Sequence, residues 1–299
     1  MLLAAPAPTF HLVAVDPSGA VSSTHLPVEA GRSHHRVIGR HSDCHLRLTH
    51  DPALSLRHLL ASAWLEEDGS PTLRLLDLGG DVPLRLEDGS LCTGLRANGS
   101  ALAGLRSYCL FFLYDDGQAW PNDPQEAWDS LGDRATAKPR SEQRDGQWAA
   151  PIRPRLRLVA PSSSEDEDDS TSLSATGTVL VRLKGTAALR DLSSSGEGAI
   201  GFLRLPRDRF VRITPADLTR GVLVGRYRRC ELTRGFADNM VVSRVHLCLA
   251  CDPTGLWAID LASSNGSWDG EERITSLRLG QRADLILGNA PLVWEMNGA

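Results

Sequence analysis

Two short patterns occur once in each half of this chain, and they constrain its fold more than any other feature. Val37-Ile38-Gly39-Arg40 resembles Leu223-Val224-Gly225-Arg226. Ser55-Leu56-Arg57-His58 resembles Ser243-Arg244-Val245-His246, and the steps from arginine to serine are 15 and 17 residues. Two linked patterns in the same order indicate a duplicated domain rather than two unrelated ones.

The residues around these patterns form short apolar runs that are separated by turn residues. Phe10–Val15 precedes Asp16-Pro17-Ser18-Gly19, and Leu73–Leu78 precedes Gly79-Gly80. Further strands are expected at 108–114, 179–183, 210–213, 222–224, 245–250, 257–261 and 284–287. Strands of this length at such intervals are typical of antiparallel sandwiches. We therefore predict an all-β chain with two β-sandwich domains.

The middle of the chain has a different composition. Prolines interrupt residues 115–175 repeatedly, and Ser162–Ser174 is a tract of serine and acidic residues. Such a tract buries too little apolar surface to offset the entropy lost on ordering, which predicts a mobile linker. The expected organisation is one domain at 1–114, a linker at 115–175 and a second domain at 176–299, in agreement with about two domains for 299 residues.

Charge and composition exclude several classes of protein. The chain has 32 basic and 37 acidic residues, and five of the acidic ones are clustered at Glu165–Asp169. A basic footprint is absent, which argues against a nucleic-acid partner. No segment has the ~20 apolar residues of a membrane span, and the first residues lack the pattern of a signal peptide. Six scattered cysteines are too few for a disulfide scaffold, so we expect a reduced, cytoplasmic protein without a membrane partner.

The second half carries a set of polar residues suited to an anion. Arg226 can hold a phosphate by two charge-assisted hydrogen bonds, and Ser243 and Arg244 add a hydroxyl and a second cation. Asn265 carries a donor and an acceptor on one amide, and Gly266 permits the positive φ of a tight loop. The set lacks a nucleophile paired with a base, so it predicts binding rather than catalysis.

These residues together resemble a known family. Gly225-Arg226, Ser243-Arg244-Val245-His246, Asp260–Ser267 and Leu277–Gly288 are similar in order and spacing to the forkhead-associated (FHA) domain, over roughly residues 205–297. The resemblance implies a β-sandwich that reads phosphothreonine with loops at one end. It implies phosphate contacts from Arg226, Ser243, Arg244 and Ser264, a peptide-backbone contact from Asn265, and structural roles for Gly225, His246 and Gly266. Ser264 stands where the family more usually has threonine.

The first half resembles the same family less closely. Arg40, Ser55 and Arg57 form a possible second site. The asparagine that should follow Asp77-Leu78-Gly79-Gly80 is missing, because the chain continues Asp81-Val82-Pro83-Leu84. The alternative interpretation is a degenerate domain that serves as a docking or dimerisation surface.

Two other motifs in the chain suggest chemistry that their context does not favour. Gly196–Gly201 matches the dinucleotide fingerprint, but that motif needs an apolar strand before it and a helix after it, so we interpret it as a loop or hairpin. Ser243, His246 and Asp260 are catalytic-triad residue types without the strained turn that presents a nucleophile.

Cysteines and histidines raise the question of a metal. Cys248 and Cys251 have zinc spacing without a second pair, and residues three apart on a strand face opposite ways. Five histidines cluster in the first half without ligand spacing, and we interpret them as exposed loop residues: His34, His35, His41, His45 and His50. We therefore expect neither a metal nor a cofactor.

The leading hypothesis is a non-enzymatic adaptor in Ser/Thr kinase signalling. Its second domain would bind Thr-phosphorylated proteins, either the substrates of a kinase or the kinase itself. One alternative is an interaction or scaffold protein whose pocket does not depend on phosphorylation. Another is a nucleotide-dependent enzyme that uses Gly196–Gly201.

Overall fold

The computed structural model describes residues 7–86, 88–117, 198–207, 209–233 and 235–297. Nearly all of the regular structure in these residues is β-strand. The predicted linker beyond residue 117 and the strand expected at 179–183 lie outside the described residues, so the domain limits remain a prediction. In the described part of the chain, no helix has the length and apolar character needed to cross a membrane.

The N-terminal sandwich, residues 7–117, consists of two sheets. Its outer sheet has the order β2-β1-β11-β10-β7-β8, and its inner sheet has the order β4-β3-β5-β6-β9. The strands are β1 (Thr9–Val15), β2 (Val21–Pro27), β3 (His34–Gly39), β4 (Leu46–Arg47), β5 (Leu59–Leu65), β6 (Pro71–Asp77), β7 (Leu84–Arg85), β8 (Leu91–Cys92), β9 (Gly94–Asn98), β10 (Ala101–Leu105) and β11 (Tyr108–Asp115).

The C-terminal sandwich, residues 198–297, is also built from two sheets. The outer sheet has the order β13-β12-β21-β20-β17-β18, and the inner sheet has the order β14-β15-β16-β19. The elements are β12 (Gly201–Leu205), β13 (Arg209–Ile213), α2 (Pro215–Arg220), β14 (Val222–Val224), β15 (Leu247–Asp252), β16 (Gly255–Asp260), β17 (Ser267–Asp269), β18 (Glu272–Ile274), β19 (Ser276–Arg278), β20 (Arg282–Leu287) and β21 (Ala290–Met296).

The two sandwiches share one topology. Each outer sheet runs through its strands in the same order, so that β1, β2, β10 and β11 correspond to β12, β13, β20 and β21. The inner sheets match in the same way, and even the parallel bridge between Ile38 and Leu46 recurs between Val224 and Leu232. The prediction of two similar β-sandwiches is confirmed.

Each sandwich has its own core, which alternation along the strands defines. In β1, every second residue is buried, and Phe10, Leu12 and Ala14 point toward the inner sheet. In the C-terminal sandwich, Leu203 on β12 and Trp294 on β21 belong to the corresponding core. This period of two is what a strand with one buried face requires.

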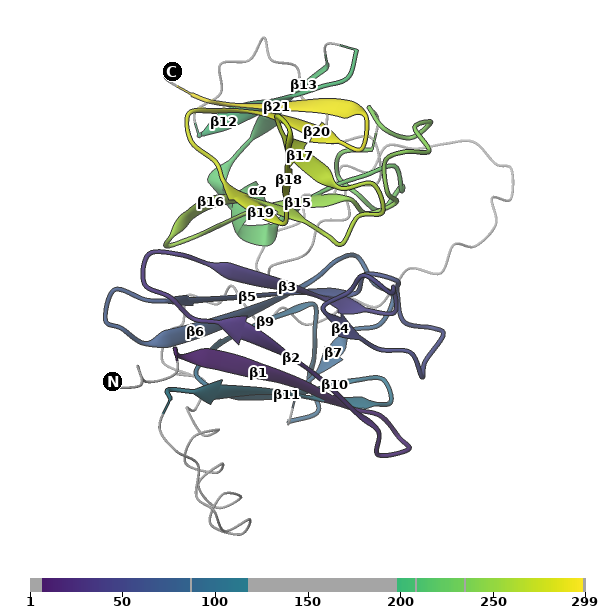
Figure 1. Cartoon of the computed structure of the whole chain (residues 1–299), viewed down its shortest axis with the longest axis vertical. Helices are drawn as coiled ribbons and strands as arrows, with labels where there is room; N and C mark the ends of the chain where they lie inside the picture. The colour runs from purple at the N-terminus through teal and green to yellow at the C-terminus, as the bar shows by residue number, and fades with distance from the viewer. Residues whose placement is uncertain (1–6, 87, 118–197, 208, 234, 298–299) are drawn as a thin grey trace, which may run out of the picture.

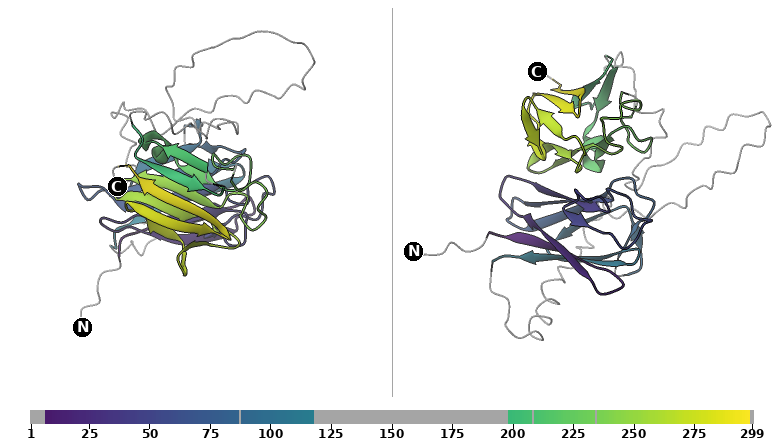
Figure 2. Two further views of the ribbon diagram at one scale, coloured as in Figure 1. Left: turned by 90° about the horizontal axis from the view of Figure 1, so that it is seen from above. Right: turned by 45° about the vertical axis from the view of Figure 1, so that its right-hand side comes forward.

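The central strands of the inner sheets are largely buried on both faces. All of β5 except its last residue is buried, and the same holds for β6 except its first. The face of each inner sheet that is turned away from its own core packs in an apolar cluster between the sandwiches. In the N-terminal sandwich this cluster includes Leu60, Leu76 and Leu78. Figures 1 and 2 show the consequence: four sheets are stacked, with the two inner sheets facing each other.

The interface between the sandwiches is pseudo-symmetric. Equivalent positions of the two halves enter the same cluster, namely Val37 with Leu223, Cys44 with Cys230, Leu60 with Cys248, Leu76 with Ile259, and Leu78 with Leu261. An interface in which the same surface is used on both sides is the arrangement of a two-fold dimer. The duplicated halves therefore pack on each other much as two identical subunits would.

Buried polar contacts complete this interface. The Ser33 hydroxyl donates to the Asp252 carboxylate at 2.6 Å, and Arg74 Nη1 donates to the Cys251 carbonyl at 2.7 Å. His35 is 7% exposed and packs in a T-shaped arrangement with Trp257, with 5.4 Å between ring centroids. The interpretation of His34 and His35 as exposed loop residues was wrong, because both lie on β3 and the second sandwich covers His35.

Candidate functional site

Three loops of the C-terminal sandwich meet beyond the ends of its inner strands. We name them the arginine loop (225–233), the serine loop (239–246) and the asparagine loop (261–266). They follow β14, precede β15 and connect β16 to β17, respectively, and lie on the right-hand side of Figure 1. Backbone and side-chain hydrogen bonds join all three.

The arginine loop begins with a close approach of two backbones. A Cβ on Gly225 would lie 2.4 Å from the Arg244 carbonyl oxygen, so only glycine fits there without movement. Arg226 then donates from its backbone nitrogen to the Ser243 carbonyl at 3.2 Å and from Nε to the Val242 carbonyl at 3.0 Å. These bonds fix the side chain and direct its guanidinium along the serine loop.

Ser243 connects the serine and asparagine loops. It is 8% exposed, and its hydroxyl oxygen accepts from the Ser264 backbone nitrogen at 3.1 Å. The hydroxyl proton remains available for donation to an anion. Arg244 beside it is exposed, while its carbonyl accepts from the Tyr227 nitrogen at 3.0 Å.

His246 is fully buried and holds the loops together. Its Nδ1 accepts from the Ser243 backbone nitrogen at 2.9 Å, so the proton sits on Nε2, which donates to the Gly266 carbonyl at 3.0 Å. Burial lowers the pKa of His246 below its ordinary value, which favours this neutral form. Its Nδ1 meets the backbone of Ser243 and not the hydroxyl, so His246 is not placed to activate that serine.

Asp260 organises the asparagine loop, a role that the sequence reasoning missed. Its carboxylate accepts from the Ser263 nitrogen at 2.8 Å, the Ser263 hydroxyl at 2.6 Å and the Ser267 hydroxyl at 2.7 Å. Ala262 between them has a φ of +54°, and Gly266 has a φ of +79°. The signal in the sequence was an acidic residue at a strand end, three residues before a serine, which is a common loop-closing pattern.

Asn265 and Ser264 are exposed at the tip of the asparagine loop. Asn265 Nδ2 donates to the Val241 carbonyl at 2.7 Å, which leaves the amide oxygen and a second N–H for a ligand. Met240, next to Val241, is 74% exposed and was not singled out from the sequence. The structure thus brings Arg226, Ser243 and Asn265 to one rim through direct contacts among the loops.

The N-terminal sandwich has the same scaffold at the equivalent place. Arg40 donates from Nε to the Leu54 carbonyl at 3.2 Å, and His58 Nδ1 accepts from the Ser55 nitrogen at 3.2 Å. His58 Nε2 lies 2.9 Å from the Val82 carbonyl, as His246 does from Gly266. Asp81-Val82 therefore occupies the place of Ser264-Asn265-Gly266, so this loop is one residue shorter and has no asparagine.

Arg57 does not join Arg40 and Ser55 in a second pocket. It is 6% exposed, and its guanidinium donates to the carbonyls of Leu261 and Ala262 in the other sandwich. With its donors directed at these carbonyls, Arg57 is turned away from a ligand at the N-terminal loops. The prediction of Arg57 as a phosphate contact there is corrected accordingly.

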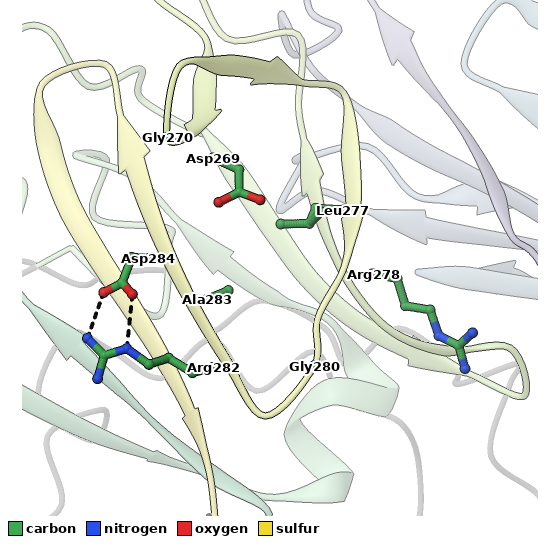
Figure 3. Close-up of a pocket in the computed structure, with 8 residues that line it drawn as sticks. All are labelled: Asp269, Gly270, Leu277, Arg278, Gly280, Arg282, Ala283 and Asp284. Atoms are coloured by element: carbon green, nitrogen blue, oxygen red, sulfur yellow. Dashed lines mark hydrogen bonds and ion pairs between the residues drawn. The ribbon is translucent and has the colours of Figure 1, made fainter.

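In a shallow pocket elsewhere on the C-terminal sandwich, Arg282 is already paired with carboxylates. Figure 3 shows Arg282 on its wall paired with Asp284, at 2.8 Å, and Arg282 also contacts Glu295 at 2.6 Å. The two carboxylates neutralise the cation. Its lining shares no residue with the three loops and comprises Asp269, Gly270, Leu277, Arg278, Gly280, Arg282, Ala283 and Asp284.

The other sequence motifs find structural roles. Gly201 opens strand β12, and no helix follows it there, which removes the context that a dinucleotide fingerprint needs. Cys248 faces the inter-sandwich cluster, whereas Cys251 packs against the C-terminal core, as expected for opposite faces of a strand. The described residues contain no group of histidine, cysteine or acidic side chains arranged to hold a metal.

Comparison with known proteins identifies part of the C-terminal sandwich. The family model described as FHA domain matches residues 222–288, so this sandwich contains an FHA domain. No curated protein matches the chain.

Several solved structures are similar to about a third of the chain. The FHA-1 domain of Mycobacterium tuberculosis Rv1747 is 22% identical, covers 33% of this chain and 97% of its own, and has a TM-score of 0.29. The yeast Dun1 FHA domain, solved with a doubly phosphorylated (pT) peptide, is 15% identical and has a TM-score of 0.31. The match covers 40% of this chain and 82% of the Dun1 domain. The FHA domain of Chlamydia trachomatis CT664 is 16% identical and has a TM-score of 0.27. The match covers 35% of this chain and 96% of the CT664 domain. At these values the likenesses add no argument about function.

Proposed function

We propose that the C-terminal sandwich binds phosphothreonine in a partner protein through the rim of its three loops. The observation that supports this most is the direct contact among them: Arg226 bonds the serine loop, and Ser264 and Asn265 bond it from the other side. The FHA match over residues 222–288 spans these residues and supports the proposal, because the resemblance to that family implies phosphothreonine recognition.

The chemistry of this rim suits a phosphate monoester. A phosphothreonine carries nearly two negative charges and three acceptor oxygens. Arg226 and Arg244 offer guanidinium donors, and Ser243 and Ser264 offer hydroxyls, so four residues can supply donors to those oxygens. Asn265 has an acceptor and a donor left over for the backbone of the peptide.

The proposed biological role is that of a non-enzymatic adaptor. Its partners would be proteins phosphorylated on threonine, either substrates of a Ser/Thr kinase or the kinase itself. Because one doubly charged anchor and a few backbone bonds must offset the ordering of the peptide, we expect modest affinity. No cofactor is required for this role.

Paired peptide libraries test the proposal. One library carries a fixed phosphothreonine and the other carries threonine at the same place, and binding to the full chain is measured by fluorescence anisotropy. We expect capture of the phosphorylated library alone. Equal binding of both libraries would refute phosphate recognition and support the interpretation as a constitutive scaffold.

Two variants test the assignment of residues. Arg226→Ala and Asn265→Ala should each raise Kd at least tenfold, since each removes a hydrogen bond to a charged or backbone group. Arg228→Ala is the matched control, because Arg228 is exposed on the same loop. Arg40→Ala, in the equivalent loop of the other sandwich, should leave Kd unchanged. Wild-type affinity in the Arg226 variant would move the site elsewhere.

A further inference from the structure

We propose that the N-terminal sandwich is a built-in support for the phosphopeptide loops, and that Arg57 is the residue that positions the asparagine loop. This inference rests on the proposed function of the C-terminal sandwich. It assigns the degenerate half a task of its own, which is to hold the reader loops in place rather than to read a second phosphate.

Arg57 touches the asparagine loop at its root. Arg57 Nε donates to the carbonyls of both Leu261 and Ala262, and Nη2 donates to the Ala262 carbonyl as well. The distance from Nε to the Ala262 oxygen is 3.1 Å. Ala262 has a positive φ of +54°, which a residue with a side chain adopts at a cost. Ser264 follows two residues later, so the orientation of this peptide unit decides where Ser264 and Asn265 point.

The burial of Arg57 indicates that its hydrogen bonds to the asparagine loop are needed to offset the lost hydration of its charge. Arg57 as a whole residue is 6% exposed, and burying a charged side chain is costly unless its donors find acceptors. Burial lowers the pKa of Arg57, with Asp260 among the groups that oppose this shift. The equivalent position in the other half is Val245, which packs against the apolar cluster. An apolar residue therefore suffices for packing at this place, and the arginine adds a specific bond to the loop.

A second contact ties the arginine loop to the same sandwich. Arg229, three residues after Arg226, donates from Nη1 to the Gly79 carbonyl at 2.9 Å and pairs with the Asp81 carboxylate. Gly79 is the equivalent of Ala262, so the shortened N-terminal loop serves as a platform for the reader. Two of the three loops of the proposed site are thus held from the other half.

The first test compares Arg57→Met with wild type in the full chain. We expect Kd for the phosphothreonine library to rise about tenfold, through a faster off-rate, because the loop loses hydrogen bonds to a charged group. Arg57→Lys keeps the charge and one donor direction, and should recover part of the affinity. Arg47→Met removes an exposed cation from the neighbouring β4 and should change mainly the on-rate.

A second control separates positioning from general loosening of the interface. Ser33→Ala removes the hydrogen bond to Asp252 at the other end of β3, about 20 Å from Gly39 along the strand. It should lower the melting temperature without changing Kd. If Ser33→Ala weakens phosphopeptide binding as much as Arg57→Met does, or if Arg57→Met binds like wild type, the inference is overturned.

Two further measurements keep the inference testable if binding or folding fails. Hydrogen exchange of the Ser264 amide, which bonds Ser243, needs no ligand, and we expect it to speed up about tenfold in Arg57→Met. Arg229→Met alters a contact that is partly exposed and should fold, and it should raise Kd by a smaller factor than Arg57→Met. An unchanged exchange rate overturns the inference, whereas absence of any phosphopeptide binding by wild type overturns only the proposed function.

Discussion

Protonation of His35 should weaken the chain in mild acid, and Figure 1 shows the reason: β3 lies in the inner sheet, beneath the other sandwich. The His35 ring contacts the Ser62 hydroxyl at 2.9 Å and packs in a T-shaped arrangement with Trp257, and Arg74 adds a buried positive charge nearby. Burial, together with Arg74 and the neighbouring His34 and Arg36, lowers the pKa of His35 to about 3. The perturbation is the change His35→Gln, which keeps a polar group of similar size and cannot take up a proton.

The magnitude follows from the difference between folded and unfolded protein. Unfolded His35 takes up a proton below its ordinary pKa of 6.5, whereas folded His35 does so only near 3. Between these values the unfolded state binds more protons, so the free energy of unfolding falls as the pH falls. From pH 7 to pH 5 this amounts to about 2 kcal/mol for His35 alone, at about 1.4 kcal/mol per pH unit below 6.5.

Other groups titrate over the same range. Burial also lowers the pKa of His246 and His58, which adds to the loss in acid. Glu231 acts in the opposite direction, because burial raises its pKa to about 7 and the folded state then holds a proton that the unfolded state has lost. These groups are the same in wild type and His35→Gln, so their contributions cancel in the comparison.

Urea unfolding followed by circular dichroism at pH 7 and pH 5 provides the assay. We expect wild type to lose about 2 kcal/mol more than His35→Gln between the two values. His25→Gln is the matched control, since His25 is exposed on β2, and it should behave like wild type. An identical pH dependence in wild type and His35→Gln would refute the reasoning and would mean that the interface does not cover His35 in solution.

Three further predictions concern stability. Gly225→Ala should lower the free energy of unfolding by about 1–3 kcal/mol in urea, because its Cβ would lie 2.4 Å from the Arg244 carbonyl oxygen. The control Gly280→Ala would place its Cβ where nothing lies within 4 Å, and it should cost less than about 0.5 kcal/mol. Equal losses in the two variants would contradict this prediction. Leu60→Ala should cost about 2–5 kcal/mol, and a loss under 1 would argue against the interface. Asp260→Asn should lower the free energy of unfolding by about 1–3 kcal/mol and should also raise Kd for the phosphopeptide, because it weakens the bonds that close the asparagine loop. Unchanged phosphopeptide binding would contradict this prediction.

The sequence predicted much of the fold from local patterns. Val222–Val224 and the runs at 210–213 and 284–287 lie in strands as expected, because alternation and turn residues are local signals. The Gly-Arg and Ser-Arg-Val-His patterns also showed which residues would form the loops of the C-terminal site. Those loops depend on short-range steps such as Ser243 to His246, which a sequence displays directly.

Other features were not predictable in this way. Arg57 looked like a phosphate ligand because it sits near the position of Arg244, and its true partners are carbonyls 204 and 205 residues away. His35 looked like part of a loop cluster although it lies on a covered strand. Asp260 was considered as a catalytic residue type and as part of the family resemblance, but its role in closing the asparagine loop was not predicted. In each case the deciding contact joins segments that are distant in the chain or depends on the direction of a side chain.

By itself, the sequence determined that this chain makes two similar β-sandwiches and that the second carries the complete set of loop residues, because strand periodicity and loop spacing are properties of neighbouring residues. Only the tertiary structure decided that the sandwiches pack through their inner sheets and that Arg57 serves the loop of the other half. The apolar runs Leu59–Leu65 and Leu73–Leu78 are typical of strands covered on both faces, but they do not say what covers them. That depends on which two surfaces bury each other, and the free energy of burial acts between residues far apart in the chain.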